Sequence, residues 1–156
     1  CNRGKRCVTA DFESEDGRAR VLRLIRHADV VIENFKVGGL AKYGLDYESV
    51  KAINPSIIYC SITGFGQDGP YAPRAGYDFL IQGMAGPMHL TGQKDGPPTK
   101  SGIAMTDIFT GLYAANSIQA ALLRRARTGI GASMTTQALC HIASISSGGT
   151  RSLPIS

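Results

Sequence analysis

The chain has 156 residues and a formal net charge of +5, from 17 basic and 12 acidic side chains. Its hydrophobic content of 43% and charged content of 19% indicate a globular chain and exclude an intrinsically disordered one. The basic excess favours an anionic partner. However, the basic residues are scattered and no aromatic-basic motif of the RNA-binding type occurs, so a phosphorylated small molecule fits at least as well as nucleic acid.

The cysteines carry no metal or disulfide signature. None of the four is spaced as CxxC, the pattern of zinc sites and redox motifs. We therefore expect reduced thiols, no bound metal, and a cytoplasmic protein, or a mitochondrial one in a eukaryote. The four are Cys1, Cys7, Cys60 and Cys140.

The first half of the chain alternates the patterns of buried strands and amphipathic helices. The β-branched run over residues 29–35 is typical of a strand buried on both faces. Strand, helix, strand order with short links predicts a right-handed parallel α/β unit, that is, a Rossmann-like sheet with flanking helices. The predicted strands cover residues 7–12, 29–35 and 56–63, the predicted helices 18–27, 40–44 and 47–53, and a predicted turn 13–17.

The carboxyl ends of the predicted strands mark the place for a ligand, because open parallel sheets bind ligands beyond those ends. Here they fall near residues 34–35 and 64–69. The sequence GFGQDGP at 64–70 suits close backbone approach to a ligand, and it equally suits an ordinary wide turn. It matches neither the P-loop nor a dinucleotide fingerprint, so a nucleotide hydrolase is rejected and a dinucleotide enzyme ranks low. Residues 77–85 then predict a helix, and 92–98 a surface turn.

The stretch over residues 101–127 predicts a long helix that begins after its N-cap, Thr106, and stops at Gly129. Its apolar run approaches the length of a membrane span, but polar residues interrupt it, so we expect a buried helix and no membrane segment. The face expected to point inward holds Ile108, Leu112, Ala115 and Leu122.

Asp107 falls in the first turn of this predicted helix. Free backbone N–H groups and the positive end of the helix dipole favour its ionised form there, and an ionised carboxylate is a usable nucleophile. On spacing alone, a capping role for Asp107 is the more frequent outcome. The residues by themselves therefore leave the catalytic and the capping roles both open.

Five motifs occur in order along the chain, and together they resemble the class III coenzyme A transferase family over residues 2–131. That family includes formyl-CoA, carnitine-CoA and succinyl-CoA:glutarate transferases, and α-methylacyl-CoA racemases are close relatives. Members are much longer than this chain, which implies an internal fragment in which residues 1–131 are part of the large domain. The motifs are ADVVIENF at 28–35, INPSIIYCSITGFGQDGPY at 53–71, RAGYD at 74–78, MTDIFTGLYA at 105–114 and RTGIG at 127–131.

The segment after Gly131 matches the family poorly. It begins with a potential strand and ends in Ser, Gly and Pro. We therefore expect residues 132–156 to be a divergent or out-of-frame tail, poorly ordered from about residue 146.

The resemblance implies an acyl transfer in which Asp107 is the nucleophile. Its carboxylate attacks the thioester of a donor acyl-CoA, forming a mixed anhydride and releasing CoA thiolate. The thiolate then gives an aspartyl-CoA thioester, and an acceptor carboxylic acid reverses the sequence. The racemases have a His at the position of Tyr77. Because a phenol, with an ordinary pKa of about 10, is a poor base near neutral pH, Tyr77 favours transfer over racemisation.

The resemblance also implies binding residues and partners. Tyr77 and Asp78 would line the substrate pocket. Phe35 and Ala10 would flank the adenine of CoA, and Lys42 would meet a phosphate. The intact protein would be an interlocked homodimer acting on acyl-CoA and a carboxylic acid, without nucleic acid or membrane. The implied CoA-binding set is Ala10, Asn34, Phe35, Gly39, Lys42 and Tyr43.

Two alternatives stay open from the sequence. One is an α-methylacyl-CoA racemase or epimerase, which deuterium exchange at the α-carbon would identify. The other is an inactive CoA-binding fragment, which would bind CoA without turnover.

Overall fold

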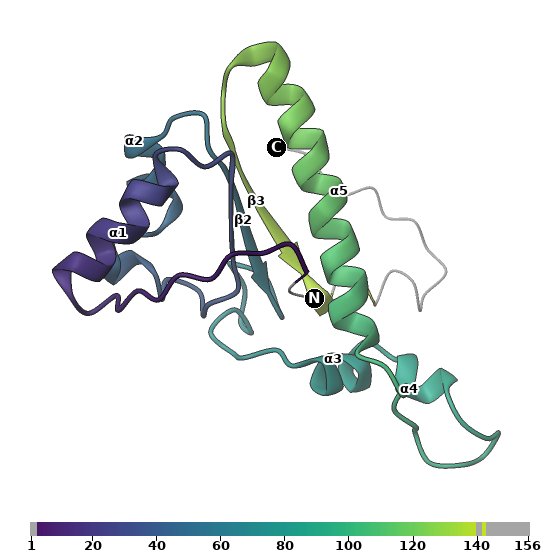
Figure 1. The fold of residues 1–156 in the computed structure, drawn as a ribbon. Helices are drawn as coiled ribbons and strands as arrows, with labels where there is room; N and C mark the ends of the chain where they lie inside the picture. The colour runs from purple at the N-terminus through teal and green to yellow at the C-terminus, as the bar shows by residue number, and fades with distance from the viewer. Residues whose placement is uncertain (1–2, 140–141, 143–156) are drawn as a thin grey trace.

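The computed structural model describes residues 3–139 and residue 142 (Figure 1). Helices and strands alternate through much of this range, which agrees with the predicted α/β class. The elements are α1 (Glu15–Ile25), β1 (Val30–Glu33), the 3-10 helix η1 (Ala41–Tyr43), α2 (Tyr47–Ile53), β2 (Ile58–Thr63), α3 (Asp78–Met84), α4 (Pro87–Leu90), α5 (Met105–Thr128) and β3 (Ala132–Gln137).

The strands form a parallel sheet in the order β1, β2, β3. At one end of the sheet, Ile58 of β2 lies opposite both Val30 of β1 and Ala132 of β3. The predicted parallel sheet with flanking helices is therefore confirmed. Strand β3 begins directly after the boundary predicted at residue 131, so the sheet continues into the segment expected to be a poorly ordered tail. The part expected to lose order from residue 146 lies outside the described residues.

Helices cover both faces of the sheet (Figure 1). Helices α1 and α2 close one apolar core against β2, whereas α5 runs along β2 and β3 and contacts α3. A second core lies where α3 meets the segment after β3. The first core consists of Ile25, Leu40, Leu45, Val50, Ile57 and Tyr59, and the second of Phe65, Ile81, Ala85, Ala138 and Ile142.

Helix α5 packs through small side chains rather than through the predicted apolar face. Ile108 and Leu112, which were expected to point inward, are 51% and 55% exposed. The apolar pattern predicts the wrong face because apolar side chains lie on nearly every side of the helix. The large apolar side chains therefore do not identify the side that meets the sheet. Among the described residues, no helix has both the length and the hydropathy of a bilayer span. The buried residues of α5 are Thr106, Thr110, Ala114 and Ala121.

The predicted strand over residues 7–12 is wrong, because the structure has no strand there. Its carbonyl groups bond to arginine side chains of α1. Arg18 Nη1 donates to Phe12 O at 2.9 Å, and Arg20 Nη1 donates to Thr9 O at 3.4 Å. These contacts hold the segment against α1 instead of against a neighbouring strand.

Local capping decides where the helices begin and end. Helix α1 begins inside the predicted turn because Ser14 caps it, with Ser14 Oγ accepting a hydrogen bond from Gly17 N at 3.0 Å. Helix α5 stops at Gly129, as predicted, where a φ of 71° suits a residue without a Cβ. Thr106 does not cap α5, because it lies inside the first turn.

Candidate active site

A cavity of about 630 Å³ opens where the carboxyl ends of β1 and β2 meet the amino ends of α3 and α5. Residues that directly follow the two strands form one wall, and the first residues of the two helices form another. This is the edge at which parallel α/β sheets bind ligands, and the volume suits a small molecule. The location agrees with the place predicted from the strand ends.

The cavity collects residues that are far apart in the sequence. It joins the predicted nucleophile, Asp107, to the predicted substrate pocket, Tyr77 and Asp78, and to two residues of the predicted CoA set, Asn34 and Phe35. These come from three segments: the end of β1, the start of α3 and the first turn of α5. The other members of the CoA set are not among its lining residues: Ala10, Gly39, Lys42 and Tyr43.

An aromatic cluster next to the cavity contains two of the remaining four members of the CoA set, Lys42 and Tyr43. The ring centroid of Phe12 lies 6.1 Å from that of Phe35 and 5.7 Å from that of Tyr43. Lys42 Nζ lies 4.5 Å from the Tyr43 ring centroid, and interaction with this side chain raises the pKa of Lys42. Phe12 was not singled out from the sequence, although it lies two residues after Ala10 in the same segment.

Two cations at the cavity were also missed. Lys36 and Arg74 both line it, and the guanidinium of Arg74 lies 4.7 Å above the Tyr71 ring centroid. The carbonyl oxygen of Lys36 accepts a hydrogen bond from Gly39 N at 2.8 Å, which places Gly39 in the turn beside the cavity. Within the described part of the chain, no group of three or more His, Cys, Asp or Glu side chains is arranged to hold a metal ion.

Asp78 is the most heavily hydrogen-bonded side chain of the cavity wall. Its Oδ1 accepts from Thr106 N at 2.8 Å, from Asp107 N at 3.4 Å and from the Thr106 hydroxyl. Its Oδ2 accepts from Gln82 Nε2 at 2.6 Å. Burial alone would raise the pKa of Asp78, but these hydrogen bonds outweigh it and the pKa is lowered. Gln82, four residues later on α3, was missed, although an Asp–Gln pair at this spacing is a recognisable helix signal.

The pKa of Asp107 is raised above its ordinary value of 3.8, first by partial desolvation of its carboxylate at the cavity wall, although the residue is exposed overall, and then by the negative charge of Asp78. The sequence predicts the opposite tendency, because a helix amino end favours a carboxylate. The difference has a structural cause. The N–H groups of Thr106 and Asp107 point to Asp78 instead, so Asp78 takes up the favourable end of the helix.

A sequence model described as CoA-transferase family III matches residues 1–149. The chain belongs to this family. Over 130 residues, this family III chain is 62% identical to the succinate–glutarate CoA-transferase of Agrobacterium fabrum, a match that covers 83% of the chain and 32% of that protein. It is 44% identical over 130 residues to human succinyl-CoA:glutarate CoA-transferase, covering 83% of the chain and 30% of the human protein.

Two solved structures share the fold of this family III chain. A CAIB/BAIF family protein from Brucella suis superposes with a TM-score of 0.90 at 58% identity, covering 97% of the chain and 42% of that protein. Rv3272 from Mycobacterium tuberculosis superposes with a TM-score of 0.87 at 31% identity, covering 94% of the chain and 41% of that protein. The chain thus spans about a third of the length of the curated relatives it matches.

Proposed function

We propose that the protein is a CoA-transferase that moves coenzyme A between an acyl-CoA, such as succinyl-CoA, and a carboxylic acid. The observation that carries this proposal is the position of Asp107, which lines the cavity at the ligand-binding edge of a family III chain. The 62% identity to a protein named succinate–glutarate CoA-transferase supports dicarboxylic substrates.

In this proposal Asp107 acts as the nucleophile of a double displacement. A carboxylate oxygen attacks the thioester carbonyl carbon, the C–S bond breaks, and CoA leaves as a thiolate from a mixed anhydride. The thiolate then attacks the Asp107 carbonyl carbon, the donor acid leaves as its carboxylate, and CoA stays on Asp107 as a thioester. An acceptor carboxylate runs these steps in reverse, so no net proton is taken up or released.

The charges around Asp107 support this chemistry. A raised pKa makes the carboxylate more basic than an ordinary one, and its ionised form is therefore a stronger nucleophile. Lys36 and Arg74 place positive charge on the same cavity, where carboxylate substrates and the leaving thiolate bring negative charge. The cavity thus combines an anionic nucleophile with cations for anionic substrates.

Tyr77 favours transfer over racemisation. Racemisation needs a base beside the carbon next to the thioester, and a phenol is a poor base near neutral pH. The side chain is 76% exposed at the cavity, so it is available to pack against a substrate. We assign Tyr77 to the wall of the acyl pocket.

The aromatic cluster is the proposed site for the nucleotide end of CoA. Phe35 belongs both to the cluster with Phe12 and to the cavity that Asp107 lines. A CoA molecule with its adenine beside Phe35 and a phosphate near Lys42 would have its pantetheine arm available to reach Asp107. Aromatic stacking and a flexible cation are suited to these two parts of the ligand.

We further propose that the protein is a homodimer. Helix α5 exposes large apolar side chains, with Ile108 at 51%, Leu112 at 55% and Leu123 at 68%. Apolar faces of this kind mark contact surfaces, and we assign this one to a second copy of the chain. Light scattering on the full-length protein tests this assignment: a dimer mass that falls to the monomer in Leu112→Lys supports it, and a monomeric wild type contradicts it.

A transfer assay on the full-length protein tests the proposed activity. With succinyl-CoA and glutarate, we expect the wild type and Asp95→Asn, a control in the exposed turn over residues 92–98 that does not line the cavity, to form glutaryl-CoA, and Asp107→Asn to form none. The same assay in heavy water separates the alternatives. Deuterium at the α-carbon without transfer indicates a racemase, and CoA binding without either reaction indicates an inactive CoA-binding protein.

A further inference from the structure

Helix α5 has no N-terminal cap from its own neighbours in sequence. The residue before its first turn is Ala104, which has no side-chain oxygen to accept a hydrogen bond. The first N–H groups of a helix have no partner within the helix, and buried ones need an acceptor from elsewhere. Thr106 is fully buried, so its backbone N–H cannot rely on solvent.

Asp78 supplies the missing acceptor from another helix. One of its carboxylate oxygens accepts hydrogen bonds from the backbone N–H groups of Thr106 and Asp107 and from the Thr106 hydroxyl. The other oxygen accepts a hydrogen bond from Gln82 Nε2. Three of these four donors converge on Oδ1, which occupies the lone pairs of that oxygen. Although Asp78 lies at the cavity wall, most of its acceptor capacity is therefore taken up by the protein itself.

Gln82 holds this arrangement in place. The side chain is 0% exposed, and its Nε2 donates to Ile103 O at 3.3 Å as well as to Asp78. Its Oε1 accepts a hydrogen bond from Ser101 N at 3.0 Å. Gln82 therefore joins α3 to the loop that leads into α5, and it also bonds to the Asp78 oxygen that Thr106 does not use.

We propose that Asp78 is a positioning residue that fixes the first turn of α5, and through it the direction of the Asp107 carboxylate, instead of contacting the substrate. The catalytic consequence rests on the proposed transferase function, whereas the capping itself does not. Asp78 also places a negative charge beside Asp107, so its removal should act on the ionisation of Asp107 as well as on its position.

Hydrogen exchange measures the capping directly in the full-length protein. In Asp78→Ala, we expect the amides of Thr106 and Asp107 to exchange about fivefold faster or more, as for the loss of a helix cap. Asp78→Asn keeps the oxygen but not the charge, so we expect at least about a twofold increase. Unchanged exchange in the folded variants overturns the proposal. If Asp78→Ala does not fold, Asp78→Asn alone decides between these outcomes.

Asp46→Ala is the matched control. Asp46 precedes α2 and accepts the Ser49 hydroxyl at 2.6 Å, so it too is a carboxylate at a helix start, but it does not line the cavity of about 630 Å³. Its loss should leave exchange in residues 101–112 unchanged. Faster exchange in this control would show a general loss of stability and would contradict the specific role of Asp78.

Kinetics separate positioning from substrate contact. For Asp78→Asn, we expect kcat to fall about tenfold while KM for the acceptor acid stays within about twofold. Loss of the neighbouring charge should also move the acid limb of the kcat profile to lower pH. A changed KM with an unmoved acid limb would assign Asp78 to the substrate and overturn the proposal. If the wild type transfers no CoA, the proposed function fails, while the exchange data still decide the capping role.

Discussion

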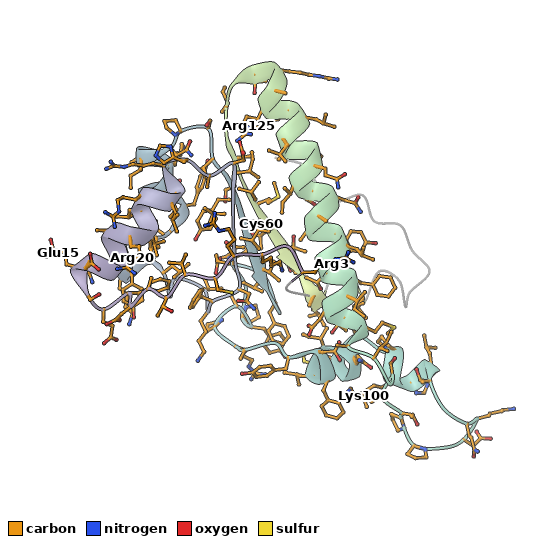
Figure 2. The ribbon with its side chains drawn as sticks, in the orientation of Figure 1. Arg3, Glu15, Arg20, Cys60, Lys100 and Arg125 are labelled. Carbon is orange, nitrogen blue, oxygen red and sulfur yellow. The ribbon has the colours of Figure 1, made fainter. Side chains whose placement is uncertain are left out.

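Arg125 Nη2 donates a hydrogen bond to Asp29 Oδ1 at 2.7 Å, joining the last turn of α5 to the residue before β1. Figure 2 shows Arg125 between α5 and the strands. Arg125 Nη1 also donates to the carbonyl oxygens of Asp29 and Ser56, each at 3.2 Å. One guanidinium thus fixes α5 to the amino ends of two strands. Because Asp107 is at the opposite end of the same helix, this contact helps to place it over the carboxyl ends of those strands.

The contact between Arg125 and Asp29 predicts that removing one of these side chains lowers stability more than removing the other. Arg125→Ala loses bonds to two backbone carbonyl groups and should lower the free energy of unfolding by about 1–3 kcal/mol. Asp29→Ala removes only an ion pair whose carboxylate is 77% exposed, and should cost less than about 1 kcal/mol. Denaturant unfolding of both variants measures the difference, and equal losses would contradict this account.

Asp107 should cost stability at neutral pH, because its pKa is higher in the folded chain than the ordinary value of 3.8. Asp107→Asn should therefore melt at a higher temperature than the wild type at pH 7. The advantage should shrink as the pH falls through the raised pKa toward 3.8, where the wild-type carboxyl becomes protonated. Thermal unfolding over a pH series checks this, and a lower melting temperature for Asp107→Asn at pH 7 would refute it.

Asp78 should show the opposite behaviour, because its pKa is lowered on folding. Its ionised form contributes stability above the ordinary pKa of 3.8, and this contribution is lost as the pH falls through the lowered pKa. Asp78→Asn should therefore melt below the wild type at pH 7, with a smaller difference in acid. The same pH series tests both carboxylates, and shifts of equal sign would contradict the assigned environments.

Phe35 should matter for CoA affinity more than for folding. It is 49% exposed and belongs to both the aromatic cluster and the cavity, so Phe35→Ala should weaken CoA binding by about fivefold to tenfold with little change in melting temperature. Leu24→Ala on α1 is the control, because Leu24 is similarly exposed at 55% and does not line the cavity. Calorimetric titration with CoA that gives equal affinities for both variants would rule out the proposed adenine site.

Gly64 and Gly76 allow the two ends of the connection between β2 and α3 to touch backbone to backbone. A Cβ on Gly76 would lie 2.5 Å from the Gly64 Cα, too close for any side chain. Gly76→Ala should separate the two ends of this connection and displace Tyr77, lowering transfer by about tenfold or more. Gly102→Ala has open space around its Cβ and should keep wild-type activity. Equal activities in the two variants would show that the close approach is unimportant.

The sequence predicted those parts of the structure that depend on local patterns. The β-branched runs identified β1 and β2, and Gly129 marked the end of α5. The family motifs named Asp107, Tyr77 and Phe35, and these residues share one cavity because parallel strand ends and helix starts meet at one edge of the sheet. Their chemical roles stay predictions.

What the sequence missed depends on contacts between distant residues. Asp78 and Thr106 are 28 positions apart in the sequence. No local sequence pattern indicates that the carboxylate of Asp78 caps the helix in which Thr106 lies. The inward face of α5 is determined by how closely its small residues approach the sheet. The spacing of apolar residues along the sequence does not reveal this approach. The segment over residues 7–12 has the alternating side-chain pattern of a strand, but Arg18 donates a hydrogen bond to one of its carbonyl groups.

The most direct measurement is mass spectrometry of the full-length protein after incubation with succinyl-CoA. If Asp107 carries the acyl exchange, a CoA-sized adduct should appear on the peptide that contains it, should be removed by hydroxylamine, and should be absent from Asp107→Asn. A CoA adduct on another residue, or transfer that persists in Asp107→Asn, would contradict the account.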